Sequence, residues 1–325
     1  MKRFLASALA LMFSAVMSPG GATAADDYPN RPVTLIAGFP AGSGADVYAR
    51  FFAKKLEENL KQTFLVENKP GGLGSLSVVA LKNAKPDGYT LLIASADQLT
   101  AAPYLFNNPP YDPVKDFEYI APVFSQAFMM VVNAKSPYKH ISELSKAMKE
   151  KGDKASYSTS NFPSTILGEM YKVNAGGLQT QQVRYKTAAD ALNDFASGAI
   201  DYSIADPVFS LARSRDGTLR ILAVSTAKRI SSVPDIPTFA EEGVPNVDVR
   251  IWWVLAAPKG TPQAIIDKMH KVMTEVTTSD EARKFVGTNG GEPMTLDSPK
   301  ATLEYATMDT KRWEEWAKIG KLEKQ

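Results

Sequence analysis

The segment Gly38–Asp46 reads Gly-Phe-Pro-Ala-Gly-Ser-Gly-Ala-Asp, and its small residues would let the backbone approach a bound molecule closely. It is not a dinucleotide fingerprint, whose third glycine would fall on Val47, nor a phosphate loop, since no Gly-Lys-Ser/Thr follows. A nucleophile elbow is excluded because Ala41 and Ala45 flank Ser43 where glycines are needed. Two interpretations stay open: a tight strand-to-helix connection, or a cradle for an anion.

Two later segments also carry groups that recognise anions. Asn161–Thr165 precedes a predicted helix, where Ser164 or Thr165 either caps that helix or donates its hydroxyl to a ligand carboxylate. Arg184 ends a predicted strand, where it either clamps a carboxylate at two points or lies in solvent.

Few residues are suited to catalysis or metal binding. There is no cysteine, which excludes thiolate chemistry and disulfides, and the two histidines, His140 and His270, have no partners at metal-ligand spacing. We expect both histidines at the surface. A secreted hydrolase would need Ser43 or Ser164 beside a histidine and an aspartate, and neither histidine lies in a motif that would place it there. The sequence therefore predicts no enzyme, no metal and no cofactor.

The adjacent Trp252 and Trp253 lie in a β-like run, so alternation places their rings on opposite faces of a strand. One ring is expected in the core, and the other is available to line a pocket.

The composition is that of a folded globular protein. The chain has 325 residues, of which 44% are hydrophobic and 22% charged, and its net charge is only +2. These values exclude a disordered, collagen-like or coiled-coil chain, and the charge balance argues against a nucleic-acid partner.

The N-terminus has the three parts of a secretory signal. Lys2 and Arg3 precede the apolar run Phe4–Met17, and small residues follow at positions 22–24. The run is shorter than the roughly 20 residues of a membrane span. We therefore expect 1–24 to be a signal peptide cleaved after Ala24 and the mature protein to be periplasmic.

Short β-like runs alternate with helical stretches in two blocks. This alternation predicts two α/β units with parallel strands and helices on both faces. The first block has strands at 33–37, 64–67 and 89–94, and helices at 45–60 and 77–84. The second has one long β-like run at 124–133, strands at 155–159, 182–185, 202–205 and 220–225, and helices at 142–151 (capped by Ser142), 164–173 and 188–197.

A last long β-like run at 249–257 precedes helices at 262–277 and 298–318. Two long runs thus bracket the central block, which predicts two lobes joined by two crossing strands. Lobe I is expected to comprise 25–123 and 255–325, and lobe II 124–254. Ligands of open α/β sheets bind beyond the carboxyl ends of strands, which directs attention to the loops after Ala37, Thr159 and Ala205.

Several segments, in order along the chain, match the motifs of one family. They are Tyr-Pro-Asn-Arg-Pro-Val at 28–33, the loop at 39–46, 66–72, Lys-Pro-Asp-Gly-Tyr-Thr-Leu-Leu at 85–92, 110–117, Gly-Ala-Ile-Asp at 198–201, 222–225, Val-Pro-Asp-Ile-Pro-Thr at 233–238 and Ala-Ala-Pro-Lys-Gly-Thr-Pro at 256–262. Together they resemble the Bug-type (TctC-like) substrate-binding proteins of tripartite tricarboxylate transporters.

The resemblance implies a type II periplasmic-binding-protein fold, in which two α/β lobes close on an organic acid such as a citrate, an amino acid or an aromatic carboxylate. Family members hold one carboxylate through backbone amides and bridging waters. Carried onto this chain, the first-lobe residues are Phe39, Ala41, Gly42, Ser43 and Gly44, and the second-lobe candidates are Asn161, Phe162, Ser164, Thr165 and Asp206.

The chain departs from the family pattern at two of these places. Thr165 stands where many members have histidine, and Arg184 begins Arg-Tyr-Lys-Thr where many have Pro-Tyr-Lys-Gly. Our hypothesis is an apolar slot formed by Phe39, Phe162 and Trp253 with Arg184 near its far end. Such a slot suits a flat aromatic dicarboxylate, such as terephthalate, better than an amino acid with a free ammonium group.

The resemblance also implies the partners. A monomeric binding protein would deliver its carboxylate by hinge closure to the membrane permease of a tripartite tricarboxylate transporter. The alternative is a ligand sensor that docks on a receptor kinase, which the sequence does not separate from transport.

Overall fold

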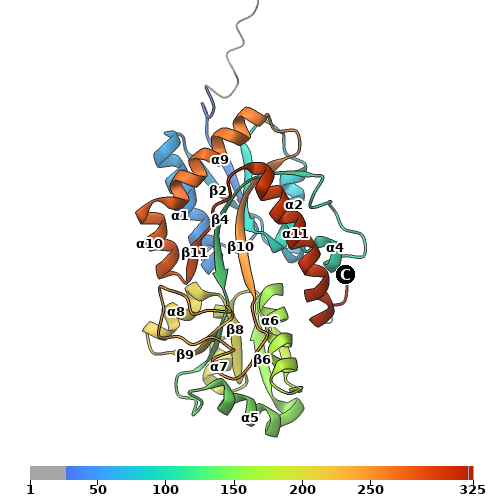
Figure 1. The fold of residues 1–325 in the computed structure, drawn as a ribbon, viewed down its shortest axis with the longest axis vertical. Helices are drawn as coiled ribbons and strands as arrows, with labels where there is room; N and C mark the ends of the chain where they lie inside the picture. Colours follow the sequence, from blue (N-terminus) through green and yellow to red (C-terminus); the bar gives the residue numbers. More distant parts are fainter. Residues whose placement is uncertain (1–26, 321, 325) are drawn as a thin grey trace, which may run out of the picture.

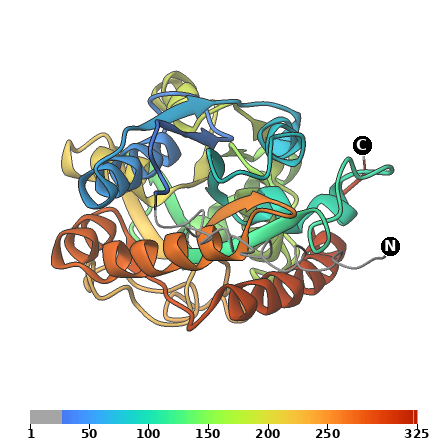
Figure 2. The same cartoon turned by 90° about the horizontal axis from the view of Figure 1, so that it is seen from above.

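The structure is a computed structural model that describes residues 27–320 and 322–324, so the predicted signal peptide 1–24 lies outside the described residues. The chain forms two β-sheets, each covered by helices on both faces (Figures 1 and 2). Within the described ranges, every helix is too short or too polar to cross a bilayer.

The first sheet has six strands in the order β11-β4-β10-β3-β1-β2. Strand β1 is parallel to its neighbours β2 and β3, while β10 is antiparallel to β3 and β4. The bounds are β1 Val33–Ala37, β2 Phe64–Asn68, β3 Thr90–Ser95, β4 Phe117–Ala127, β10 Arg250–Pro258 and β11 Gly291–Pro293. The short β11, which extends the sheet at its edge, was not predicted.

Helices cover both faces of this sheet. One face packs against α1 Gly44–Leu60, α9 Gln263–Thr278 and α10 Asp280–Thr288, and the other against α2 Ser75–Lys82, α3 Asp97–Thr100, α4 Ala102–Leu105 and part of α11 Pro299–Ile319. The alternation of side chains along a strand produces this division. Trp253 joins the first core and Trp252 the second, which confirms the prediction that the two rings lie on opposite faces.

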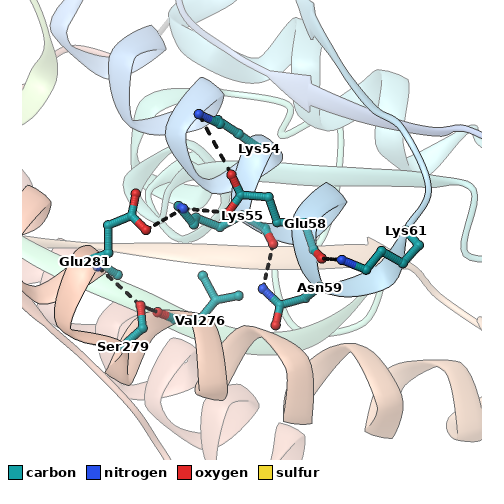
Figure 3. A network of polar contacts seen from close by, with 9 residues as sticks. Lys54, Lys55, Glu58, Asn59, Lys61, Val276, Ser279 and Glu281 are labelled. Atoms are coloured by element: carbon teal, nitrogen blue, oxygen red, sulfur yellow. Dashed lines mark hydrogen bonds and ion pairs between the residues drawn. The ribbon is translucent and has the colours of Figure 1, made fainter.

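A polar network ties α1 to α10 (Figure 3). The nearly buried Lys55 places its ammonium 2.5 Å from a Glu58 oxygen and 2.6 Å from a Glu281 oxygen. Glu281 lies in the first turn of α10, where a negative charge complements the free N–H groups of the helix.

Lys55→Met is expected to lower the free energy of unfolding by about 1 kcal/mol, because both carboxylates stay solvated when the ammonium is removed. Urea unfolding at pH 7 measures the change. The matched control is Lys54→Met, since that exposed lysine is 3.8 Å from Glu58 and makes no link to α10. Equal losses in the two variants would contradict a role for Lys55 in holding α10.

The second sheet has five strands in the order β7-β6-β8-β5-β9. Its strands are β5 Met129–Asn133, β6 Ser156–Thr159, β7 Gln181–Arg184, β8 Tyr202–Ala205 and β9 Leu219–Val224, and its helices are α5 Ile141–Lys151, α6 Phe162–Asn174, α7 Leu192–Ser197 and α8 Pro207–Arg215. Two cores on opposite faces of this sheet hold it together.

The predicted β-like run at 124–133 connects the two sheets. It comprises the end of β4 and all of β5, which lie in different sheets and are separated at Phe128, whose N–H donates to Ser225 Oγ at 2.8 Å. The chain returns to the first sheet after Val224 and pairs again from Arg250. Figure 1 shows β4 and β10 side by side, running toward the second sheet.

The C-terminal helix α11, which the sequence assigns to lobe I, packs against the cores of both sheets. Ala306 packs on the first sheet, whereas Trp313 and Trp316 join the core of the second. Gly320 at its end lies so close to Ile166 of α6 that a Cβ would stand 2.5 Å from the Ile166 Cδ1.

Two predicted caps are wrong by two to four residues. Helix α5 begins at Ile141, not after Ser142, and the Glu143 side chain accepts hydrogen bonds from the N–H groups of Lys139 and His140. Helix α6 is capped by Asn161, not by Ser164 or Thr165. The predicted helix at 188–197 opens as a 3₁₀ turn over Ala188–Ala191 before α7.

Candidate functional site

A cavity of about 540 Å³ lies between the two sheets and is lined by residues from both. The N-terminal ends of α1, α6 and α8 all open onto it. Eight of the predicted ligand-binding residues line this cavity: Phe39, Ala41, Gly42, Ser43, Gly44, Asn161, Asp206 and Trp253.

The loop before α1 is held in place by one carboxylate. Ser43 caps the helix by accepting from the Asp46 N–H, and the buried Asp46 in turn accepts from the Gly42 N–H at 2.9 Å. Its two oxygens also receive Arg50 Nε and Asn68 Nδ2, both at 2.8 Å. The N–H groups of Gly44 and Ala45 have no acceptor in the part of the chain that the structure describes, so they are available to an anion.

The hydrogen bonds that Asp46 accepts keep its carboxylate ionised. Burial alone would raise the pKa of Asp46, but hydrogen bonds from Arg50, the Gly42 N–H and Asn68 outweigh it and bring that pKa below its ordinary value of 3.8. The carboxylate is therefore ionised at neutral pH and fully occupied by the loop that it organises.

The two lobes touch at Gly44. A Cβ at this position would stand 2.4 Å from Asp206 Oδ1 and 3.0 Å from Val208 Cβ, both in the second lobe. Asp206 caps α8 by accepting from the Phe209 N–H at 3.0 Å, so its carboxylate is not free to turn away. The absence of a side chain at Gly44 is thus what allows the N-termini of α1 and α8 to approach each other.

An aromatic wall closes one side of the cavity. The rings of Phe39 and Trp253 stack with centroids 5.3 Å apart, and Trp253 stacks in turn on Phe124 at 5.1 Å. Trp252 packs away from the cavity against Tyr305. A flat or apolar ligand body would find a complementary surface at Phe39 and Trp253.

Charged side chains of both signs line the cavity: Asp97, Lys186, Asp190, Asp206 and Arg213. Burial raises the pKa of Asp97 to about 6, and the nearby Asp309 adds to this effect. Burial likewise raises the pKa of Asp206, although the backbone N–H groups that it accepts oppose the shift. Arg213 is paired with Asp216 at 2.7 Å.

Four predicted residues do not line this cavity. Phe162 and Arg184 stack on each other, with the guanidinium 5.1 Å from the ring centroid, beside a different hollow near the C-terminal residues. Ser164 bonds back to Asn161 at 2.8 Å, and Thr165 accepts from Gln182 Nε2 at 2.6 Å. The predicted slot of Phe39, Phe162 and Trp253 with Arg184 at its end is therefore corrected: of these four residues, Phe39 and Trp253 line this cavity and the other two do not.

Helical geometry explains this separation. Successive helix residues point about 100° apart, so the residues that follow the Asn161 cap turn to different sides of α6. Pro163 is on the cavity side, whereas Phe162 is directed toward β7 and the core.

The structure does not assemble a hydrolase triad from the predicted residues. His140 is exposed and pairs with Glu242 at 3.1 Å, as expected of a surface residue. His270 is half-buried, contrary to the expectation, with Nδ1 2.8 Å from the Ile120 carbonyl oxygen. Neither histidine lines the cavity that contains Ser43.

Sequence reasoning missed several cavity residues, notably Asp97 and Gln126. Asp97 follows β3, and a polar residue just beyond a parallel strand is a usable signal that the sequence already contained. Helix α8 was also missed, although Asp206 followed by Pro207 is a typical helix start. Gln126 had no such signal, because it lies inside a strand.

Known proteins share the sequence pattern of this chain. The family model described as "Tripartite tricarboxylate transporter family receptor" matches residues 48–320. A UPF0065 protein from Bordetella bronchiseptica is 33% identical over 273 residues, covering 83% of this chain and 80% of that protein.

Solved structures agree with this match. The R. palustris protein Rpa4515, determined with adipate, has a TM-score of 0.86 and 27% identity. The match covers 92% of this chain and 100% of Rpa4515. The periplasmic binding protein BugD has a TM-score of 0.84 and 30% identity over 92% of this chain and 100% of its own. These likenesses confirm the predicted two-lobed α/β binding-protein fold. The chain belongs to the tripartite tricarboxylate transporter receptor family, as a Bug-type, TctC-like member.

Proposed function

We propose that this protein captures a small organic carboxylate in the cavity between its lobes and does not transform it. The observation that carries the proposal is the convergence of the N-terminal ends of α1, α6 and α8 on one cavity. Each contributes a partial positive charge. The N–H groups of Gly44 and Ala45, which have no acceptor among the described residues, suit a carboxylate oxygen. The adipate bound to the R. palustris relative supports this chemistry.

Closure of the two lobes completes the pocket. Residues of the first lobe, such as Ser43, and of the second, such as Asn161, line the same cavity, so a ligand contacts both only when the lobes are together. The ligand shifts the equilibrium between open and closed forms through these additional contacts.

The ligand body is proposed to be flat or apolar because Phe39 and Trp253 form the wall beside the loop. Terephthalate is one acid with such a body. With Arg184 outside the cavity, a second carboxylate would depend on Lys186 or Arg213.

Titration calorimetry with adipate, citrate, terephthalate and aspartate tests the proposal. We expect one-to-one binding of at least one of them with a Kd of roughly 1 μM, an enthalpy change, and no product on prolonged incubation. A mass spectrum of the small molecule that co-purifies with the protein extends the test to other acids. Failure to bind any carboxylate, or turnover of the bound compound, contradicts the proposal.

Delivery to a tripartite tricarboxylate-type permease is proposed from the family assignment. Uptake of the radiolabelled ligand is expected to fall when the gene is deleted and to return when it is restored. If deletion of the gene leaves uptake unchanged but abolishes a transcriptional response to the ligand, the sensor is favoured instead.

Export to the periplasm, with cleavage after Ala24, is proposed from the N-terminal sequence. Intact-mass analysis of protein from the periplasmic fraction is expected to give a chain that begins at Ala25. A chain retaining Met1, or its recovery in the cytoplasmic fraction, would contradict this.

Light scattering is expected to show a monomer.

A further inference from the structure

Asp97 is an acidic side chain of the cavity wall that has no cationic partner in the described part of the chain. It opens α3 directly after β3, and its carboxylate is hydrogen-bonded by the Ser95 hydroxyl. Ser95 is the register partner of Trp253 in β10, which places Asp97 beside the aromatic wall.

A second hydrogen-bond acceptor lines the same cavity. Gln126 of β4 is the register partner of Ile251, so Gln126 and Ser95 belong to strands on either side of β10. Gln126 lines the cavity, is only 9% exposed, and its buried Oε1 has no hydrogen-bond partner within the described residues. A buried acceptor without a donor is costly, which makes this oxygen an independent indication that something else supplies the donor.

We infer that Asp97 and Gln126 receive a positively charged nitrogen of the ligand, so that the ligand is a carboxylate that also carries an ammonium group. This inference rests on the proposed function, because the carboxylate is the part held at the loop before α1. An ammonium group offers three N–H donors, enough for a carboxylate oxygen of Asp97 and for Gln126 Oε1. The half-buried ring of Phe39, which lines the cavity, also offers an aromatic surface to a cation.

The surroundings of Asp97 leave its negative charge uncompensated. The titratable groups that interact with it are Asp309 of α11, itself paired with Arg312 and bonded to Thr100, and the phenol of Tyr111, whose pKa is raised in part by Asp97. The Asp97 pKa of about 6 leaves the carboxylate mostly ionised at pH 7.5 and mostly protonated at pH 5. A diacid would therefore meet a negative charge at neutral pH, while an ammonium group would neutralise it.

Two matched ligand pairs test the inference. Adipate is compared with 6-aminohexanoate, and terephthalate with 4-(aminomethyl)benzoate; in each pair an aminomethyl group replaces one carboxylate. In at least one pair, the Kd of the amino acid at pH 7.5 is expected to be lower than that of its diacid by a factor of about 10 or more. Its affinity is expected to fall between pH 7.5 and pH 5, as Asp97 becomes protonated.

Asp97→Asn removes the charge and keeps the shape. It is expected to weaken binding of the favoured amino acid by about 10- to 100-fold and to strengthen binding of its diacid. The control Asp153→Asn, at an exposed position outside the cavity, is expected to change neither. Thermal melts establish that both variants are folded, and the pH series on the unmodified protein provides a test that needs no variant.

The outcomes separate this inference from the proposed function. If the diacids bind more tightly than the amino acids and Asp97→Asn leaves that order unchanged, the inference is overturned while carboxylate capture stands. If no carboxylate of any kind binds, the proposed function itself fails.

Discussion

Gly44→Val is expected to weaken ligand binding by about 10- to 100-fold while the protein remains folded. The first atom of the new side chain would occupy space 2.4 Å from Asp206 Oδ1, where two non-bonded heavy atoms cannot both fit. Asp206 is held by the Phe209 N–H and cannot turn away without uncapping α8. The clash exists only when the lobes are together, so it penalises the closed form.

The variant is tested by calorimetry with whichever carboxylate the wild type binds. A matched control is Gly287→Ala, since that helical glycine lies outside the cavity and its Cβ would make an ordinary contact, 3.5 Å from Ser232. Small-angle scattering is expected to show Gly44→Val more open than wild type in the presence of ligand. Wild-type affinity in Gly44→Val would mean that the contact between α1 and α8 is not part of the bound state.

Asp46→Ala is expected to have the largest effect on stability, a loss of about 3 kcal/mol in the free energy of unfolding at pH 7. The substitution removes the acceptor of the Gly42 N–H and of the Asn68 amide, and it leaves Arg50 without its 2.8 Å partner. Ligand binding is expected to weaken as well, because the loop at 39–44 loses the bonds that fix it.

Urea unfolding measures this loss, with Asp153→Ala as the control at an exposed aspartate. The pH dependence has a definite sign. Because the pKa of Asp46 is lowered in the folded state, its contribution is complete above the ordinary value of 3.8 and is lost as the pH falls through the lower folded value. The stabilities of wild type and Asp46→Ala are therefore expected to begin converging as the pH falls below about 4. A difference that persists unchanged at pH 2 would show that Asp46 acts through packing and not through its charge.

Local patterns alone revealed much of the architecture. The alternation of strand and helix, the Gly/Pro loop before α1 and the paired tryptophans are short-range features, because strand and helix periodicity and backbone permissiveness are properties of neighbouring residues. The loop residues from Phe39 to Gly44 line the cavity for this reason: they must lie at the carboxyl end of β1 wherever that strand is placed.

Tertiary packing decided which side chains of the second lobe and of the strand ends line the cavity. Arg184 looked suited to a carboxylate, but the packing of β7 beside α6 directs it onto Phe162. Asp97 and Gln126 belong to different segments of the chain and line the same cavity because β3 and β4 flank β10. The rotation of a helix about its axis and the pairing of distant strands depend on contacts summed over the whole core, whereas the amino-acid sequence specifies each element mainly through its neighbours.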